Sequence, residues 1–360
     1  MAAASPRVAI IRTSDRTTKR RCLRKWDWSS NLRQGLEPTE HPMPLWVGSG
    51  FHYALEDYYG YQHYSHPSEA FAAFTDACRR TPKLELPDEW EEGLELAAAM
   101  LDYYPHWIRS RPKYKTLWVD GVPQVEVDFE IELPFDATPY GYDQVLYRGT
   151  FDRIAIDEWD GLWIIEYKTA KQFEDRHFMT DQQVSSYSWA GQVVYDRPVM
   201  GVVYQQHKKT VPVGPRILSA GKISTAGNMI TSHRLYKIAL EKLYTDVSKA
   251  PAQNIRFLGD LAAQETEHRD AYIRRDLITR NEHQIAAEGQ KILLELPSML
   301  NPDIAIYPSP TRDCHYCAFQ DPCVAVDDGS DYEEELEAIS QTRAQEYNTW
   351  RPYLRIPSLE

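Results

Sequence analysis

The sequence predicts an α/β fold in which helices flank a central mixed β-sheet. Three runs rich in β-branched and aromatic residues, at 125–133, 145–156 and 162–168, lie close together in the middle of the chain. Two earlier segments, 67–81 and 88–109, place apolar residues mostly at helical spacing. We therefore expect one sheet with helices packed against it.

The remaining elements follow the same pattern. Residues 180–196 are expected to form a helix, 199–206 a further strand, and 231–298 two or three helices. No repeat and no Gly-x-x-x-x-Gly-Lys-Ser/Thr phosphate loop is present, so no motor activity is expected. We expect one domain over residues 1–325 and an acidic, partly helical tail over 326–360.

Composition and charge limit the class of protein. The 360 residues are 42% hydrophobic and 26% charged, and no apolar run has the length of a signal peptide or membrane span, so we expect a cytoplasmic protein. A formal net charge of -13 argues against nucleic-acid binding. The charge is unevenly spread, however: residues 327–337 carry seven acidic residues, whereas 16–25 carry six basic ones. A local basic groove therefore remains compatible with the total.

The segment 147–171 carries the residues with the clearest chemistry. Asp152 lies on one predicted strand, and Glu166 and Lys168 lie two apart on the next, so the latter two share a face. Paired carboxylates suit Mg²⁺ or Mn²⁺, and a nearby ammonium can stabilise charge on a phosphodiester. Taken alone, a Glu/Lys pair is more often solvated, but the apolar neighbours of these residues favour a buried strand.

The turn between the two strands decides whether Asp152 joins that face. A two-residue loop at 160–161 would pair Asp152 with Thr169 and place the two acids on opposite faces. A three-residue loop at 159–161, with its glycine in the left-handed conformation, would pair Asp152 with Lys168, and all three side chains would converge.

This arrangement resembles a known family. Asp152 followed by Glu166-x-Lys168 is similar to the core of PD-(D/E)XK nucleases, in the variant with Glu in the third motif. Upstream, GSGFHYALE resembles the Gly-x-x-x-His-x-x-Leu-Glu helix of RecB-type nucleases, in which the His, here His52, is a metal ligand. A lone His on an apolar face is usually structural, but the ordered set of motifs favours the ligand role.

A further motif follows the hairpin. DQQVSSYSWAG places Gln183 and Tyr187 four apart, like the Gln-x-x-x-Tyr motif of the RecB-type branch, although this spacing alone is common in amphipathic helices. The resemblance implies a restriction-endonuclease-like core. It also implies catalytic roles for Asp152, Glu166, Lys168, Gln183 and Tyr187, and metal ligation by His52, Asp152 and Glu166.

Five cysteines indicate a metal or cluster site rather than disulfides. Cys314, Cys317 and Cys323 form a Cys-x2-Cys-x5-Cys array that needs a fourth ligand, whereas Cys78 fits a buried core thiol. The array is also compatible with a structural Zn²⁺ held by four Cys, or by three Cys and His315.

RecB-type enzymes with an iron-sulfur cluster, including AddB and CRISPR-associated adaptation nucleases, resemble this array and draw their first cysteine from near the N-terminus. Cys22 matches that position, although Leu23 stands where the family usually has proline. The resemblance implies a 4Fe-4S cluster that joins the N- and C-terminal segments.

Together these patterns predict an Mg²⁺- or Mn²⁺-dependent DNA exonuclease acting on single-stranded ends. The resemblance is to the stand-alone, phage-type form associated with DNA recombination or repair, which would work in the host cytoplasm. The alternatives are a non-catalytic nucleic-acid-binding or adaptor protein, and the nuclease subunit of a helicase-nuclease complex. Lys208, Lys209 and Lys222 are candidate DNA contacts, and Trp26, Trp28 and Tyr204 are candidates for stacking on bases.

Overall fold

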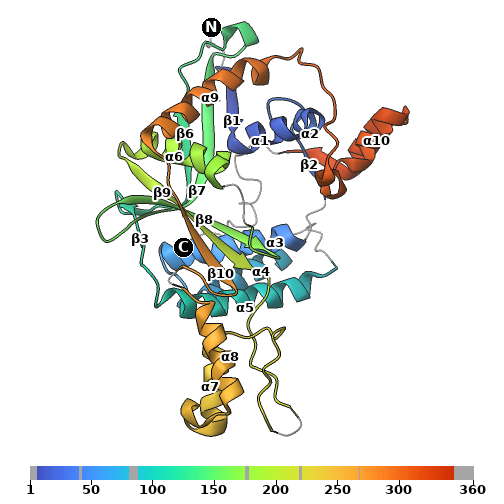
Figure 1. Ribbon diagram of the computed structural model, residues 1–360. Coiled ribbons are helices and arrows are strands. Elements are labelled where there is room, and N and C mark those ends of the chain that lie inside the picture. The colour runs from blue at the N-terminus through green and yellow to red at the C-terminus, as the bar shows by residue number, and fades with distance from the viewer. Residues whose placement is uncertain are drawn as a thin grey trace.

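The structure is a computed structural model that describes residues 6–39, 43–80, 88–174, 178–218, 221–266 and 268–343. At its centre is a seven-stranded mixed sheet of order β1-β7-β8-β9-β10, in which β3 and β6 also pair with β7 (Figure 1). The strands are β1 (Val8–Arg12), β3 (Lys115–Thr116), β6 (Val125–Glu132), β7 (Gln144–Ile156), β8 (Leu162–Ala170), β9 (Val199–Lys208) and β10 (Ile273–Ile278). The predicted mixed sheet is confirmed.

Strand β7 changes partner along one edge. Its residues 144–148 pair in parallel with β1, and its residues 153–156 pair antiparallel with β8. Both partners use the same edge, because β6 occupies the other one over 146–153. Residues 149–152 consequently have no described strand partner on that edge, and the sheet splits there. Asp152 lies at the end of this gap.

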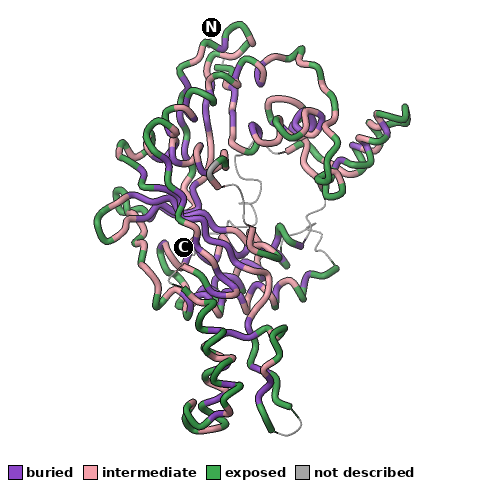
Figure 2. Tube along the Cα trace, viewed as in Figure 1, coloured by how far each residue is buried: buried purple, intermediate pink, exposed green. Residues whose placement is uncertain are grey.

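Helices cover both faces of the sheet, as predicted. Figure 1 shows α3, α4 and α5 on one side and α6 and α9 on the other, and Figure 2 shows the buried strands between them. The bounds of these helices are α3 (Met43–Tyr59), α4 (Pro67–Arg80), α5 (Trp90–Ile108), α6 (Gln182–Tyr195) and α9 (Glu282–Leu300).

Helices α3 and α4 touch closely at Gly50. A Cβ atom there would lie 2.4 Å from the ring of Phe71 and 2.8 Å from that of Phe74, so no larger side chain fits without displacing them. The absence of a side chain at Gly50 thus allows α3, the helix that carries His52, to pack closely against α4.

The N- and C-terminal segments pack against each other. Strand β2 pairs antiparallel with β11, and the ring of Trp28 lies 5.7 Å from that of Phe319 in a small separate core. The elements involved are α1 (Thr13–Arg21), α2 (Leu23–Ser29), β2 (Leu36–Pro38), α10 (Gln320–Asp328), α11 (Tyr332–Ile339) and β11 (Ser340–Thr342). Of the predicted acidic tail, residues 344–360 lie outside the described part of the chain.

An arm projects from the body between β9 and β10 (Figure 1). It contains α7 (His233–Tyr244) and α8 (Ala252–Ala263) and has its own small core around Tyr236 and Leu240. Although the chain as a whole is acidic, residues 209–263 contain eight Lys or Arg and only three Asp or Glu. The arm is therefore a basic extension of an acidic protein.

The prediction for residues 231–298 was partly wrong. The three helices α7, α8 and α9 are present, but β10 interrupts them. This strand has six residues, too few to show a clear period, and it becomes a strand by pairing along β9. Minor elements complete the chain: a ribbon of β4 (Trp118–Val119) and β5 (Val122–Pro123), and 3-10 turns at Thr138–Tyr140, Phe178–Thr180, Val247–Lys249 and Arg312–Tyr316. No helix in the described ranges is both long enough and apolar enough to span a membrane.

Candidate metal centre

The turn between β7 and β8 is longer than either predicted alternative. Ile156 pairs with Leu162, so five residues, 157–161, connect the strands. The Asp157 carboxylate accepts hydrogen bonds from the backbone N–H groups of Trp159 and Gly161, and Asp160, not Gly161, has the positive φ of +64°. The Asp157 side chain therefore stabilises a five-residue turn that neither predicted loop describes.

The longer turn still brings the predicted side chains together. Relative to the three-residue alternative, it shifts the pairing by two residues, and a shift of two leaves every side chain on the same face. Extended by one residue beyond the pair of Arg153 and Ile165, the register places Asp152 opposite Glu166 rather than opposite Lys168. The ladder ends there, and the Tyr167 N–H donates to Asp152 Oδ2 at 2.7 Å. This bond fixes the carboxylate at the split in the sheet.

Helix α3 brings His52 to the same place. His52 Nδ1 lies 2.8 Å from Glu126 Oε1 and 3.7 Å from Asp152 Oδ1. Ligand atoms of His52, Glu126 and Asp152 all lie within 4.8 Å of one another. Of the predicted ligands, His52 and Asp152 are therefore adjacent in space although one hundred residues separate them.

Glu126 was missed by the sequence analysis. It lies on β6 between Val125, which pairs with Arg153, and Val127, which pairs with Phe151, so it stands opposite Asp152. Its φ of +47° is unusual for a non-glycine residue and marks a local distortion at the site. The alternation in VEVDFEIEL places acids at every second position, but only the register of β6 against β7 singles out Glu126.

Glu166 lies beside this group and is held by two donors. Its Oε1 accepts a hydrogen bond from Gln183 Nε2 at 2.9 Å and forms an ion pair with Lys168. Its Oε2 is buried and has no hydrogen-bond partner among the described residues. A buried carboxylate oxygen without a donor is costly, and it is the kind of atom that a metal ion would satisfy.

The pKa values of three side chains at the site are shifted from their ordinary values. Burial, reinforced by the negative charge of Asp152, raises the pKa of Glu166 to about 7. Burial likewise raises the pKa of Asp152, although His52 opposes the shift. Burial lowers the pKa of His52, but the carboxylates of Asp152 and Glu126 outweigh it and raise that pKa to about 10. Three carboxylates in a buried place thus attract positive charge.

The residues present fit a divalent cation. Oxygen ligands predominate, as Mg²⁺ and Mn²⁺ prefer, and one imidazole accompanies them. The side chains of His52, Glu126 and Asp152 remain 27%, 18% and 11% exposed, so the group is reachable from solvent. The unpartnered oxygen of Glu166, on the adjacent strand, lies outside this group of three and is a further candidate ligand.

Helix α6 brings both residues of the Gln-x-x-x-Tyr pattern toward the hairpin. Asp181 caps the helix by accepting from the Val184 N–H, which orients its first turn. Gln183 reaches Glu166, as described above. Tyr187 packs edge-on against Phe151, with ring centroids 5.6 Å apart, one residue before Asp152. Gln183 thus contacts a proposed ligand, whereas Tyr187 supports the strand that carries another.

The profile of the PD-(D/E)XK nuclease superfamily matches residues 14–324, which is most of the chain. The chain belongs to the PD-(D/E)XK nuclease superfamily. Membership implies a hydrolase with a nucleic-acid substrate and a divalent metal ion, in agreement with the geometry above. The resemblance drawn from the motifs is confirmed at this level. No curated protein gives a significant match to the chain.

The four predicted cluster cysteines have free thiols and are partly buried. Arg24, two residues after Cys22, donates to the Cys323 carbonyl at 3.0 Å and lies 3.3 Å from Cys323 Sγ. The segments that carry Cys22 and Cys323 therefore meet. In the described part of the chain, no cysteine belongs to a compact group of metal-binding side chains like that of His52. Cys78 is buried in the helical layer, as predicted.

The predicted DNA contacts are spread over two places. Lys208 ends β9 and lies over the ring of Phe173, and Lys209 donates to the Pro44 carbonyl. Lys222 is exposed on the arm. The predicted stacking residues Trp26, Trp28 and Tyr204 are all buried in hydrophobic cores, so that prediction is wrong.

Proposed function

We propose that this protein is a metal-dependent DNA exonuclease that acts on single-stranded ends. The observation that carries the proposal is the convergence of His52, Glu126 and Asp152 at the split in the sheet, with Glu166 and its ion-pair partner Lys168 beside them. Four groups able to hold a cation, next to an ammonium, form a site for phosphodiester hydrolysis.

In the proposed mechanism, His52, Glu126, Asp152 and Oε2 of Glu166 hold Mg²⁺ or Mn²⁺. The bound ion would lower the pKa of a water molecule and neutralise charge on the phosphate. Lys168, whose side chain is 37% exposed and forms an ion pair with Glu166, would stabilise the negative charge that develops on the phosphate. Gln183 holds the carboxylate of Glu166, and the Tyr167 N–H holds that of Asp152.

The basic arm supports a nucleic-acid substrate despite the charge of -13. Lys and Arg side chains concentrated on one extension attract phosphates locally. Salt screens the repulsion from acidic side chains elsewhere on the protein beyond about 10 Å. We propose that Lys222 acts there, and that Lys208 and Lys209 act at the end of β9.

Cleavage of labelled oligonucleotides tests the proposed activity. With Mn²⁺, a linear single strand labelled at either end should shorten stepwise, and a circular single strand of the same sequence should stay intact. Cutting of the circle would show an endonuclease instead. A preference for duplex DNA or for RNA would contradict the proposed substrate.

Substitution of Glu126 tests a ligand that the motifs do not reveal. Glu126→Gln should weaken Mn²⁺ binding about tenfold or more, because a charged hard ligand becomes a neutral one. Asp128→Asn is the matched control, since Asp128 lies two residues further along β6, is exposed and bonds Thr150 instead. Calorimetric titration of both variants measures the effect. Equal affinities for Mn²⁺ would remove Glu126 from the site.

We also propose that Cys22, Cys314, Cys317 and Cys323 hold a 4Fe-4S cluster. Free thiols, the pairing of β2 with β11 and the contacts of Arg24 with Cys323 support it, because they already bring the two terminal segments together. A structural Zn²⁺ is the alternative.

Anaerobic purification distinguishes the two metals. Protein that carries the cluster should be brown and contain about four iron atoms per chain. Serine at Cys22 or Cys317 should bleach the colour, because each thiolate holds one corner of the cluster. Cys78→Ser, a change outside the proposed site, should keep it. Stoichiometric zinc without iron would contradict the cluster.

A further inference from the structure

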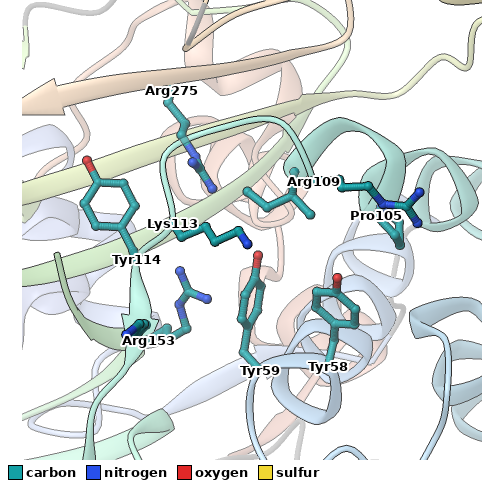
Figure 3. Close-up of a pocket in the computed structure, with 10 residues that line it drawn as sticks. Tyr58, Tyr59, Pro105, Arg109, Lys113, Tyr114, Arg153 and Arg275 are labelled. Carbon is teal, nitrogen blue, oxygen red and sulfur yellow. The ribbon is translucent and has the colours of Figure 1, made fainter. Parts of the chain in front are cut away.

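A pocket of about 350 Å³ lies on the α3 side of the sheet and combines cations with tyrosines. Figure 3 shows the side chains of Arg153, Arg275 and Lys113 approaching one another in the space between Tyr114 and Tyr59. Five cations line it, namely Arg109, Lys113, Lys115, Arg153 and Arg275, and no described Asp or Glu does. The pocket is therefore strongly positive.

Arg153 is the innermost cation. It is 1% exposed, and its Nε and Nη1 atoms have no hydrogen-bond partner among the described residues. The centre of its guanidinium lies 3.6 Å from the centroid of the Tyr59 ring, so one face of the group is covered by a cation-π contact. Its charge is paired with no carboxylate in the described ranges. A buried guanidinium in this state is costly unless an anion joins it.

Arg275 reaches the pocket from β10 and is 4% exposed. Its Nε donates to Gln205 Oε1 at 2.7 Å and its Nη1 to the Pro112 carbonyl at 3.0 Å. Both partners are neutral and fix its position without cancelling its charge. The pocket thus contains two buried guanidinium groups, held in place by aromatic rings and neutral acceptors.

The pocket adjoins the metal centre but is separate from it. Arg153 follows Asp152 on β7, and Tyr59 lies two turns after His52 on α3. The ring of Tyr167 stands between the two sites: its centroid lies 6.3 Å from that of Tyr59 and 6.4 Å from that of His52. A ligand in the pocket would therefore be a short distance from a phosphodiester at the metal centre.

We propose that this pocket binds the phosphomonoester group of a nucleotide. Five cations without an acid favour a dianion over a carboxylate, and planar guanidinium groups match phosphate oxygens. The volume exceeds the needs of a phosphate alone, and Tyr58 and Tyr114 offer flat faces for a sugar and base. The identity of the ligand, either the phosphorylated end of a strand or a released mononucleotide, rests on the proposed function. The binding of an anion in the pocket does not depend on that function.

Calorimetry in EDTA tests the binding without any catalysis. Inorganic phosphate and dAMP should each bind once per chain, dAMP more tightly, whereas deoxyadenosine should not bind. If neither phosphate nor dAMP binds at constant ionic strength, the proposal is wrong. If the protein binds dAMP but cleaves no nucleic acid, the phosphate-binding pocket is supported and the proposed nuclease activity is contradicted. If it cleaves nucleic acid but binds neither phosphate nor dAMP, only the proposed pocket is contradicted.

Variants place the ligand in the pocket. Arg153→Gln should weaken dAMP binding about tenfold or more, because a charge-assisted bond is lost in a buried setting. Should that variant not fold, the double change Lys113→Gln and Lys115→Gln alters only exposed side chains and should weaken binding severalfold. Lys249→Gln on the arm is the control and should bind as the wild type does. Unchanged affinity in the double variant would place the anion elsewhere and contradict the proposal.

Competition separates the two sources of phosphate. A 5′-phosphorylated, a 3′-phosphorylated and an unphosphorylated oligonucleotide are each added with dAMP in EDTA. Displacement of dAMP by one phosphorylated end identifies a strand terminus as the ligand. Binding of dAMP that no oligonucleotide displaces identifies the mononucleotide. Displacement by the unphosphorylated strand as strongly as by the others would contradict a phosphomonoester site.

Discussion

Replacing Asp152 by asparagine is expected to lower the cleavage rate by about 10³-fold or more and to weaken Mn²⁺ binding. Asp152 lies between Glu126 on β6 and Glu166 on β8, and the change removes its negative charge. The amide oxygen of the new asparagine can still accept a hydrogen bond from the Tyr167 N–H. A loss of several kcal/mol of stabilisation corresponds to a factor of this size. Cleavage of labelled single strands and calorimetry with Mn²⁺ measure the two effects.

Asp128→Asn provides the comparison, because it makes the same chemical change on the neighbouring strand at an exposed carboxylate. It should cut at the wild-type rate. Circular dichroism establishes that both variants are folded. An Asp152→Asn protein that retains wild-type activity would remove Asp152 from the chemistry.

Lys168→Ala is expected to reduce cleavage by about 10²- to 10³-fold while Mn²⁺ still binds. The ammonium is not a ligand in the proposed site, and its ion pair is with Oε1 of Glu166, leaving Oε2 available. Its loss therefore removes stabilisation of the developing negative charge and spares the ligand atoms. Lys168→Arg should keep part of the activity, since the charge remains but the geometry differs.

The test compares the two variants with wild-type protein at saturating Mn²⁺. A Lys168→Ala protein that cuts at the wild-type rate would refute this role. One that binds no Mn²⁺ would show instead that Lys168 is needed to assemble the site.

Local patterns in the sequence were sufficient for much of the fold. Runs rich in β-branched and aromatic residues predicted β6, β7 and β8, and apolar spacing predicted α4 and α5, because the apolar side chains of these elements are buried against their neighbours. Glu166 and Lys168 share a face as a direct consequence of strand geometry, whatever the turn does. The same reasoning failed for β10, which depends on its neighbour β9 rather than on its own period.

Sequence patterns do not define the register between paired strands. Glu126 reaches the site only because β6 pairs with β7 in one particular alignment, and its motif contains three other acids on the same face. The five-residue turn was missed because Asp157 stabilises it through its side chain. The pocket around Arg153 and Arg275 was equally hidden, since strands β7 and β10 are not neighbours in the sheet.

Calorimetric titration of EDTA-treated protein with Mn²⁺, run beside cleavage of labelled single-stranded DNA, tests the central claim most directly. We expect no cleavage in EDTA, restoration of cleavage over the same Mn²⁺ concentrations at which the ion binds, and loss of both in the Asp152→Asn variant. Cleavage that persists in EDTA, or Mn²⁺ binding that Asp152→Asn leaves unchanged, would contradict a metal-dependent nuclease centred on His52, Glu126, Asp152 and Glu166.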